Sequence, residues 1–252
     1  MRIAGGAVRR VLVRSVPFLA PGLAVDFSQM KADSGKTKIA TITIWALVGL
    51  AVLILAGLIM FWPRKEPDPV TAWREGITAQ VGALARKDWS AATAAEGTES
   101  LGAPARITIH HSGAGIFSAI DRGTVTSAIK AIQDTHIGAN GWDDIGYHYI
   151  VDPFGCLWEG RHLDRIGAHA GSLELNRGNI GILLLGNFDL QEPPPAQLER
   201  LGDLLAVLQG IFTIADSEIY THNRIRIMEG LTPTACPGQH IIEWLESRRK
   251  KR

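Results

Sequence analysis

An uninterrupted apolar run near the N-terminus constrains this chain more than any other feature. Residues 39–62 contain no charged side chain in 24 positions, and a helix needs about 20 apolar residues to cross the hydrocarbon core of a bilayer. The alternative, a buried helix of a soluble core, is disfavoured by so long an uncharged run. Phe61 and Trp62 close the run with aromatic rings suited to a membrane interface. We therefore predict one transmembrane helix over residues 39–62.

The charges that flank this run predict its orientation. Residues 1–38 carry seven Lys and Arg side chains, whereas residues 64–68 combine two basic with two acidic ones. The positive-inside rule therefore places the segment 1–38 in the cytoplasm and the larger C-terminal part outside. A cleavable signal peptide is the competing interpretation, but the run is longer than a typical signal core and no A-x-A site follows it. Translation from Met30 is a further hypothesis about the gene.

The rest of the chain divides into a linker and a domain. Residues 63–105 are turn-rich and polar, which predicts a stalk with one short helix over residues 73–87. Residues 106–252 are long enough for one well-filled core. A formal net charge of +1 gives no support to a nucleic-acid partner. The basic run over residues 248–252 is interpreted as a solvated terminus.

Periodicity predicts the elements of the C-terminal domain. Residues 106–111 alternate apolar and polar side chains, as a strand does, and residues 124–136 repeat apolar positions at helical spacing. Because strands and helices alternate, we expect an α/β fold with a mixed central β-sheet flanked by helices. The other expected elements are strands over 147–151, 156–159 and 179–188, and helices over 195–212 and 239–247.

Two cysteines are too few for a disulfide scaffold, and they are interpreted separately. Cys156 has no chemical context and is interpreted as a small buried hydrophobe. His136 continues a helical apolar stripe and is interpreted as a core histidine. His169 lies among small residues, where a loop can approach a ligand.

A stronger set of candidates is His110, His222 and Cys236. His110 ends a predicted strand, His222 follows the strand-like residues 219–221, and Cys236 precedes a Pro-Gly turn. Two imidazoles and a thiolate suit zinc, with a fourth position left for water. Spacing alone makes this a weak signal, because the chain contains no C-x-x-C or H-E-x-x-H motif.

Several motifs together resemble one known family. They occur in the family's order over about residues 106–244: ITIHHS (107–112), GWDDIGYHYIVDPFG (141–155), LWEGR (157–161), GAHA (167–170), NIGILLLGNF (179–188) and TACPG (234–238). This set is similar to the peptidoglycan recognition protein and type-2 N-acetylmuramoyl-L-alanine amidase family. The resemblance implies the fold of that family and a zinc-dependent hydrolase of peptidoglycan.

The resemblance also implies roles for individual residues. The family's zinc ligands correspond to His110, His222 and Cys236, its catalytic tyrosine to Tyr147, and the partner two residues before the cysteine to Thr234. The chain departs from the family in one place, because fourteen positions separate His222 from Cys236. The insert, roughly residues 226–231, is expected to enlarge a loop over the site and makes His222 the less secure ligand.

The form of the motif further implies a substrate. Gly141 and Trp142 before the D-D-I-G-Y residues resemble the form that accompanies meso-diaminopimelate peptides. Arg161 would help to hold the extra carboxylate of that residue, since guanidinium groups bind carboxylates in a bidentate manner; an internal ion pair is the equally weighted alternative. Together with His169, these residues form the expected substrate-binding set.

The expected reaction is hydrolysis of the amide between N-acetylmuramic acid and L-alanine. Zinc would activate water, while Tyr147 and Thr234 would stabilise the developing oxyanion. The expected location is the bacterial inner membrane, single-pass, with the domain on the periplasmic side. One alternative is a recognition module that binds peptidoglycan without cutting it, and another is a phage-type, membrane-anchored endolysin. A secreted immune receptor fits poorly with an N-terminal anchor.

Overall fold

The computed structural model describes residues 34–60, 69–95 and 98–250. The chain forms two compact units, residues 1–65 and residues 66–252, which are described separately. Of the predicted segments, nearly all of 1–38 and the last two residues of 39–62 lie outside the described residues.

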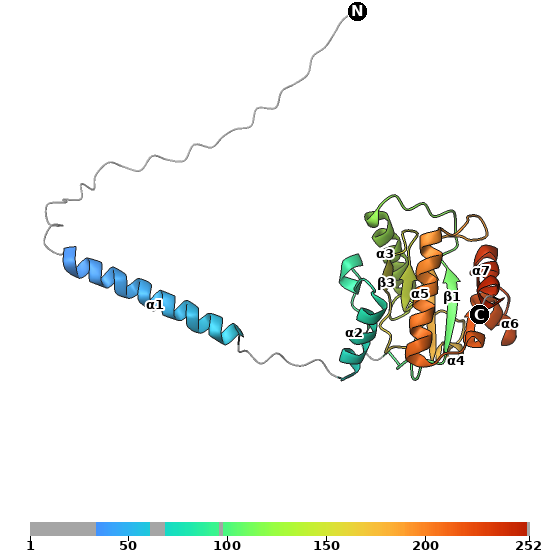
Figure 1. The fold of residues 1–252 in the computed structure, drawn as a ribbon, viewed down its shortest axis with the longest axis horizontal. Coiled ribbons are helices and arrows are strands. Elements are labelled where there is room, and N and C mark those ends of the chain that lie inside the picture. The colour runs from blue at the N-terminus through green and yellow to red at the C-terminus, as the bar shows by residue number, and fades with distance from the viewer. Residues whose placement is uncertain (1–33, 61–68, 96–97, 251–252) are drawn as a thin grey trace, which may run out of the picture. The chain divides into compact units, whose positions relative to one another are not determined.

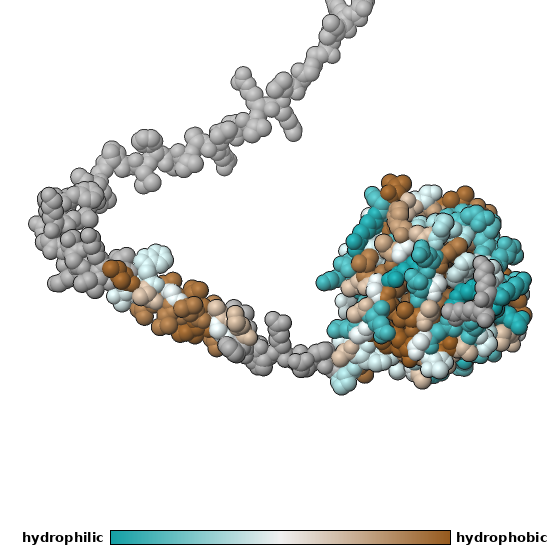
Figure 2. All heavy atoms as spheres, viewed as in Figure 1, coloured by the Kyte–Doolittle hydropathy of each residue, from teal (hydrophilic) through white to brown (hydrophobic). Residues whose placement is uncertain are grey.

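The first unit contains helix α1, Ser34–Met60. The described apolar side chains of this helix are exposed, among them Trp45 at 69% and Leu53 at 71%, and Figure 2 shows the helix as predominantly hydrophobic. Among the described residues, no helix combines the length and the apolar character that a membrane crossing requires.

A five-stranded sheet organises the second unit, in the order β3-β2-β4-β1-β5. Every pairing is parallel except β2 with β3, which form an antiparallel hairpin. The predicted mixed central sheet flanked by helices is therefore confirmed. The strands are β1 Arg106–His111, β2 Tyr149–Val151, β3 Leu157–Glu159, β4 Asn179–Leu184 and β5 Ile219–Thr221.

Helices cover both faces of this sheet (Figure 1). Helices α2, Pro69–Val81, and α5, Pro195–Phe212, pack on one face together with α7, Gln239–Lys250. Helix α3, Arg122–Gly138, and the 3-10 helix η2, Arg86–Trp89, cover the other face. The remaining elements are α4 Leu173–Asn176, the 3-10 helix η3 Asp216–Glu218 and α6 His222–Met228.

Alternation along the central strands explains this two-sided core. On β4, Ile180 and Ile182 face the cluster around α5, whereas Leu183 faces the cluster around α3. On β1, Ile107 and Ile109 likewise belong to the α5 side, so His110 points to the other face, because successive side chains of a strand alternate. The strand pattern thus directs His110 away from the larger apolar cluster.

The boundary of the domain differs from the expected one. Residues 63–105 are predicted as a stalk, yet Ile77, Val81 and Leu101 lie in the main apolar core and Trp89 lies in the core on the opposite face. Trp89 is 1% exposed, and its indole N–H donates to the carbonyl of Glu159 at 2.8 Å. The segment has the composition of a linker, but these few large apolar side chains pack into the domain.

Two smaller expectations are corrected by the structure. Cys156, expected to be buried, is exposed in the turn that joins β2 to β3, and both cysteines are free thiols. Arg248, expected in a solvated tail, pairs with Asp216 at 3.0 Å with only 12% of its side chain exposed. The exposure of these two side chains depends on tertiary packing and cannot be predicted from local composition.

Candidate metal centre and cleft

The sheet register brings two of the predicted ligands together. In the parallel pairing of β1 with β5, Ile109 lies opposite Thr221, so the next residues, His110 and His222, leave the same edge of the sheet side by side. Their ring centroids are 4.5 Å apart. Thr221 caps the N-terminus of α6, since its side chain accepts the N–H of Arg224, and this cap fixes where the helix begins.

The third predicted ligand, Cys236, reaches this edge from a loop before α7. The ligand atoms of Cys236, His110 and His222 all lie within 4.8 Å of one another, and Cys236 Sγ is 3.7 Å from His110 Nδ1. The loop is tied to α6, because the Asn223 N–H donates to the Cys236 carbonyl at 2.9 Å. Asn223 Oδ1 also accepts the N–H of Thr234 at 3.0 Å.

A glycine allows this loop to lie close to the backbone of Phe188, which follows β4. Gly238 has a φ of 89°, and a Cβ built there would lie 2.5 Å from the backbone carbon of Phe188. Any larger residue would therefore push the loop, and Cys236 with it, away from the sheet edge.

A chain of hydrogen bonds sets the tautomer of His110. His169 Nε2 is 3.1 Å from the carbonyl of Asn179, which can only accept, so this nitrogen carries the proton. His169 Nδ1 must then accept, and its 3.1 Å contact with His110 Nε2 requires a proton on that nitrogen of His110. The Nδ1 lone pair of His110 is consequently free and faces Cys236 Sγ.

The histidines of the cluster are neutral. Burial lowers the pKa of His110 well below its ordinary value, and burial followed by the charge of Arg226 lowers the pKa of His222 to about 4. His222 Nε2 is buried and has no hydrogen-bond partner among the described residues. A buried polar nitrogen without a partner is costly, and a metal ion would satisfy it.

The cysteine needs a cation to act as a thiolate. Burial raises the pKa of Cys236 to about 12, although the N–H of His111, 3.4 Å from Sγ, partly opposes this shift. Two neutral imidazoles and one thiol in mutual contact match the donor set of a three-residue zinc site with an open fourth position. The residues of the cluster therefore fit zinc.

Tyr147 and Thr234 lie beside this cluster. The Tyr147 ring is 5.1 Å from the His110 ring, and burial raises the pKa of its hydroxyl well above the ordinary value, so the hydroxyl remains a donor. Thr234 Oγ1 accepts the N–H of Cys236 at 3.3 Å, which leaves its own hydroxyl hydrogen available. Both side chains therefore offer neutral donors next to the ligands.

A cleft of about 440 Å3 opens beside the cluster and is lined by Trp142, Tyr147, His169, His222 and Arg226, among others. The ring of Trp142 packs against His136 with centroids 4.6 Å apart. His136 in turn accepts the N–H of Gly146 at 3.0 Å, as a satisfied histidine. Gly141, at a φ of 67°, supplies the turn before Trp142.

Arg161 is held inside the domain. It is 4% exposed, and its guanidinium donates to the backbone carbonyls of Ile145, Ile166 and Asp144 at 2.8–2.9 Å. These contacts are structural, and they shape the loops on either side of the cleft. A carboxylate-binding role for Arg161 stays a prediction, as do the substrate contacts of Gly141, Trp142 and His169.

Several residues that build the site are not among those expected from the sequence. Asn176 Oδ1 accepts the N–H groups of His169 and Ala170 and so shapes their loop, and Asn223 holds Thr234. Arg226, part of the predicted insert, lines the cleft. In the sequence, each of these residues is only an asparagine or a single charged residue next to a strand or a predicted ligand. Such residues are too common to identify a site.

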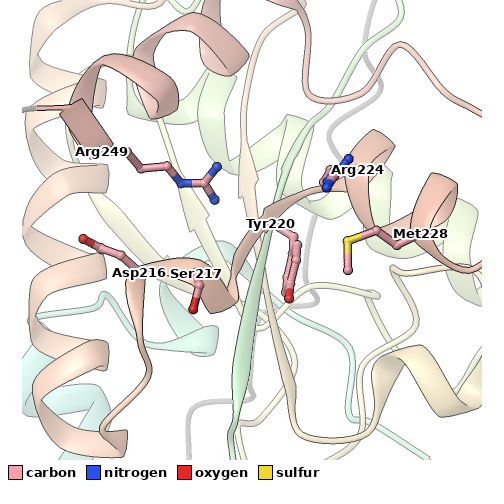
Figure 3. Close-up of a pocket in the computed structure, with 6 residues that line it drawn as sticks. All are labelled: Asp216, Ser217, Tyr220, Arg224, Met228 and Arg249. Atoms are coloured by element: carbon pink, nitrogen blue, oxygen red, sulfur yellow. The ribbon is translucent and has the colours of Figure 1, made fainter.

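A second, larger cavity of about 590 Å3 is lined by none of the candidate ligands His110, His222 and Cys236 (Figure 3). Side chains of η3, β5, α6 and α7 surround it, including Tyr220, Arg224, Met228 and Arg249. Tyr220 donates its hydroxyl to Glu218 at 3.2 Å. The cavity contains no metal-ligand cluster among the described residues, so the candidate site is the smaller cleft.

Known proteins share this arrangement of sequence and fold. The Amidase_2 family, described as N-acetylmuramoyl-L-alanine amidase, matches residues 100–239. Peptidoglycan-recognition protein SC1a of Drosophila melanogaster is 31% identical over 167 residues, which cover 66% of this chain and 83% of that protein. The N-acetylmuramoyl-L-alanine amidase of Sus scrofa is 30% identical over 142 residues, 55% of this chain but only 22% of that protein.

Among solved structures, peptidoglycan recognition protein-LE is similar with a TM-score of 0.54 and 28% identity, covering 62% of this chain and 87% of that chain. That protein was crystallised in complex with tracheal cytotoxin, a monomeric peptidoglycan of the diaminopimelic acid type.

Proposed function

Since this chain belongs to the N-acetylmuramoyl-L-alanine amidase family, Amidase_2, we propose that its domain is a zinc-dependent amidase. Its substrate is the amide between N-acetylmuramic acid and L-alanine in bacterial peptidoglycan. The observation that carries the proposal is the convergence of His110, His222 and Cys236, whose ligand atoms lie within 4.8 Å of one another. The relatives of this chain include a recognition protein as well as an amidase, and the presence of all three candidate ligands supports catalysis over recognition alone.

The residues of the site have different roles in the proposed reaction. His110, His222 and Cys236 would hold zinc, which when bound supplies Lewis-acid activation of water at neutral pH. His169 holds His110 in the tautomer that presents Nδ1 to the metal position. Tyr147 and Thr234 would donate hydrogen bonds to the oxygen on which negative charge develops as the amide is attacked.

We propose that the substrate is a peptidoglycan with meso-diaminopimelate. The sequence form at Gly141 and Trp142 supports this, and so does the similar recognition protein whose structure contains a diaminopimelic acid-type ligand. Tyr147 lines both the cleft and a neighbouring cavity of about 380 Å3. A substrate extending to both sides of Tyr147 would place its glycan and its peptide in different cavities.

We further propose that residues 39–62 anchor the chain in the bacterial inner membrane, with the domain on the periplasmic side. The uncharged sequence of this segment and the exposed apolar side chains of α1 support the proposal. Membrane fractionation and protease accessibility of the domain in spheroplasts test it. A chain recovered in the soluble fraction at all times would contradict an anchor, and timed release at lysis would favour a phage-type endolysin.

The amidase proposal is tested by metal content and product analysis on the full chain purified in detergent. We expect about one zinc per chain, and release from meso-diaminopimelate peptidoglycan of peptides that begin with L-alanine, identified by mass spectrometry. Cys236→Ser should lose both properties, because it removes a ligand.

The other cysteine provides the matched control for this test. Cys156→Ser should retain zinc and activity, since Cys156 is exposed and outside the cluster. Tight binding of peptidoglycan by the zinc-loaded wild-type chain without release of peptide would refute the amidase and leave a recognition module.

A further inference from the structure

One charged side chain of the cleft, Arg226, has no role in the proposed chemistry. Among the described side chains that line it, Arg226 is the only Lys, Arg, Asp or Glu, because the others are aromatic, apolar, small or uncharged polar groups, together with the buried His169 and the half-buried His222. A cleft whose only charge is a guanidinium favours an anionic group in its ligand.

The insert between His222 and Cys236 positions this arginine. Helix α6 begins at His222 and carries Arg226 one turn later, and residues four apart on a helix are neighbours, about 5–6 Å apart at Cβ. The helix then ends, and Gly230 at a φ of 68° turns the chain back. Leu231 packs against the small apolar cluster of Ala170, Leu175 and Ile225 and so anchors the insert.

Local contacts brace the guanidinium without neutralising it. Arg226 Nε donates to the carbonyl of Thr232 at 2.6 Å, and a Cβ built on Gly171 would lie 2.7 Å from Arg226 Nη1, which places that nitrogen over the loop that carries His169. Within the described part of the chain, every ion pair involves other residues. The Nη groups of Arg226 are thus held at the cleft without a carboxylate partner.

We propose that Arg226 binds the free carboxylate of the second residue of the peptide stem and makes the enzyme selective for stems that are not amidated there. The inference rests on the proposed function, which puts the scissile amide beside His222. An extended residue spans about 3.3–3.6 Å, so the second residue extends from about 3.5 Å to about 7 Å from that bond. This range includes the rise of one helical turn, about 5.4 Å, which separates Arg226 from His222 on α6. A braced guanidinium pairs with a carboxylate in a bidentate manner and loses this contact with a neutral amide.

The test compares three muramyl tripeptides with the full, zinc-loaded chain. One carries free carboxylates at both the second residue and the diaminopimelate, the second is amidated at the second residue only, and the third at the diaminopimelate only. We expect amidation of the second residue to lower kcat/KM by about 10- to 100-fold, as the loss of a charge-assisted hydrogen bond does. Amidation at the diaminopimelate should change kcat/KM little.

Two variants assign the preference to one side chain. Arg226→Gln should reduce the discrimination to within about twofold, mainly by slowing cleavage of the free acid. Arg224→Gln is the matched control, because Arg224 lies on the same helix but lines the separate cavity shown in Figure 3. It should leave the discrimination unchanged.

The outcomes separate this inference from the amidase proposal. Equal cleavage of the free and amidated stems by the wild-type chain, or loss only on amidation of the diaminopimelate, overturns the role of Arg226 while the amidase stands. If no stem is cleaved, the same three ligands are compared by calorimetric binding. An Arg226-dependent preference for the free acid then supports the inference although the amidase proposal fails, and equal affinities overturn both.

Discussion

At the scale of single residues, the hydrogen bond from His110 to His169 decides which ring nitrogen of His110 faces Cys236 in the proposed zinc site. A metal-binding histidine is oriented by the partner of its other ring nitrogen, and the loss of such a partner typically costs about 10- to 100-fold in metal affinity. His169→Ala should therefore weaken zinc binding by about that factor, and His169→Gln, which retains an acceptor, should weaken it less. Competition with a chelator measures the affinity.

A surface histidine provides the control for this prediction. His162 contacts Glu159 at 3.0 Å and is not part of the cluster, so His162→Ala should keep full zinc affinity. If His169→Ala lowers thermal stability yet binds zinc as the wild type does, the residue supports the fold only.

In the proposed reaction, the hydroxyl of Tyr147 donates a hydrogen bond to the developing oxyanion and does not bind the metal. Removal of one donor to a developing oxyanion usually costs about 100- to 1,000-fold in rate, so Tyr147→Phe should lower kcat by about that factor with zinc content unchanged. Steady-state kinetics and metal analysis on the same preparation measure both. Tyr220→Phe, which removes the hydroxyl that contacts Glu218 in the other cavity, should leave kcat unaltered. Full activity in Tyr147→Phe would exclude the proposed role.

At the scale of elements, helix α2 belongs to the domain although its sequence suggests a stalk. Ile77 is 5% exposed and packs in the main core, and truncation of a buried isoleucine to alanine costs about 2–5 kcal/mol. Ile77→Ala should reduce the free energy of unfolding of the domain by an amount in this range, as measured by urea denaturation. Gln80→Ala, at an exposed position of the same helix, should change it little. If Ile77→Ala leaves the free energy of unfolding unchanged, α2 packs only weakly against the rest of the domain.

The elements themselves follow from the sequence to different degrees. Helix α5 spans residues 195–212 as predicted, because its apolar stripe and its N-terminal prolines are local signals. Strand β1 also has its predicted bounds. Strand β4 is shorter than the apolar run that predicts it, since Leu185 and Phe188 continue into the cores beyond the last strand pairing. Periodicity therefore locates an element, and neighbouring strands decide where it ends.

At the scale of the whole molecule, buried neutral histidines make the stability of the domain sensitive to acid. Burial lowers the pKa of His148 to about 4 from a value of 6.5, and its Nδ1 accepts the N–H of Gly181 at 2.9 Å, which requires the neutral ring. Because the folded pKa lies below the unfolded value, this contribution is complete above about pH 6.5 and is lost as the pH falls towards 4.

The size of this effect can be measured directly. Linkage over this window gives a loss on the order of 3 kcal/mol for His148, and His136, whose pKa burial also lowers to about 4, adds to it. We expect the urea midpoint to fall steeply between pH 6.5 and 4 in the zinc-free chain, where metal release does not contribute. A midpoint that is constant over this range would contradict the burial of neutral histidines.

The sequence by itself determined the order of strands and helices, the family, and the identity of the three clustered side chains. These depend on local periodicity and on motifs in which neighbouring residues occur together. Tertiary structure alone decided the tautomer of His110, the exposure of Cys156, the burial of Ile77, Val81 and Leu101, and the place of Arg226 at the cleft. The tautomer of His110, for example, depends on its contact with His169 in a distant segment of the chain, and local spacing carries no information about such contacts.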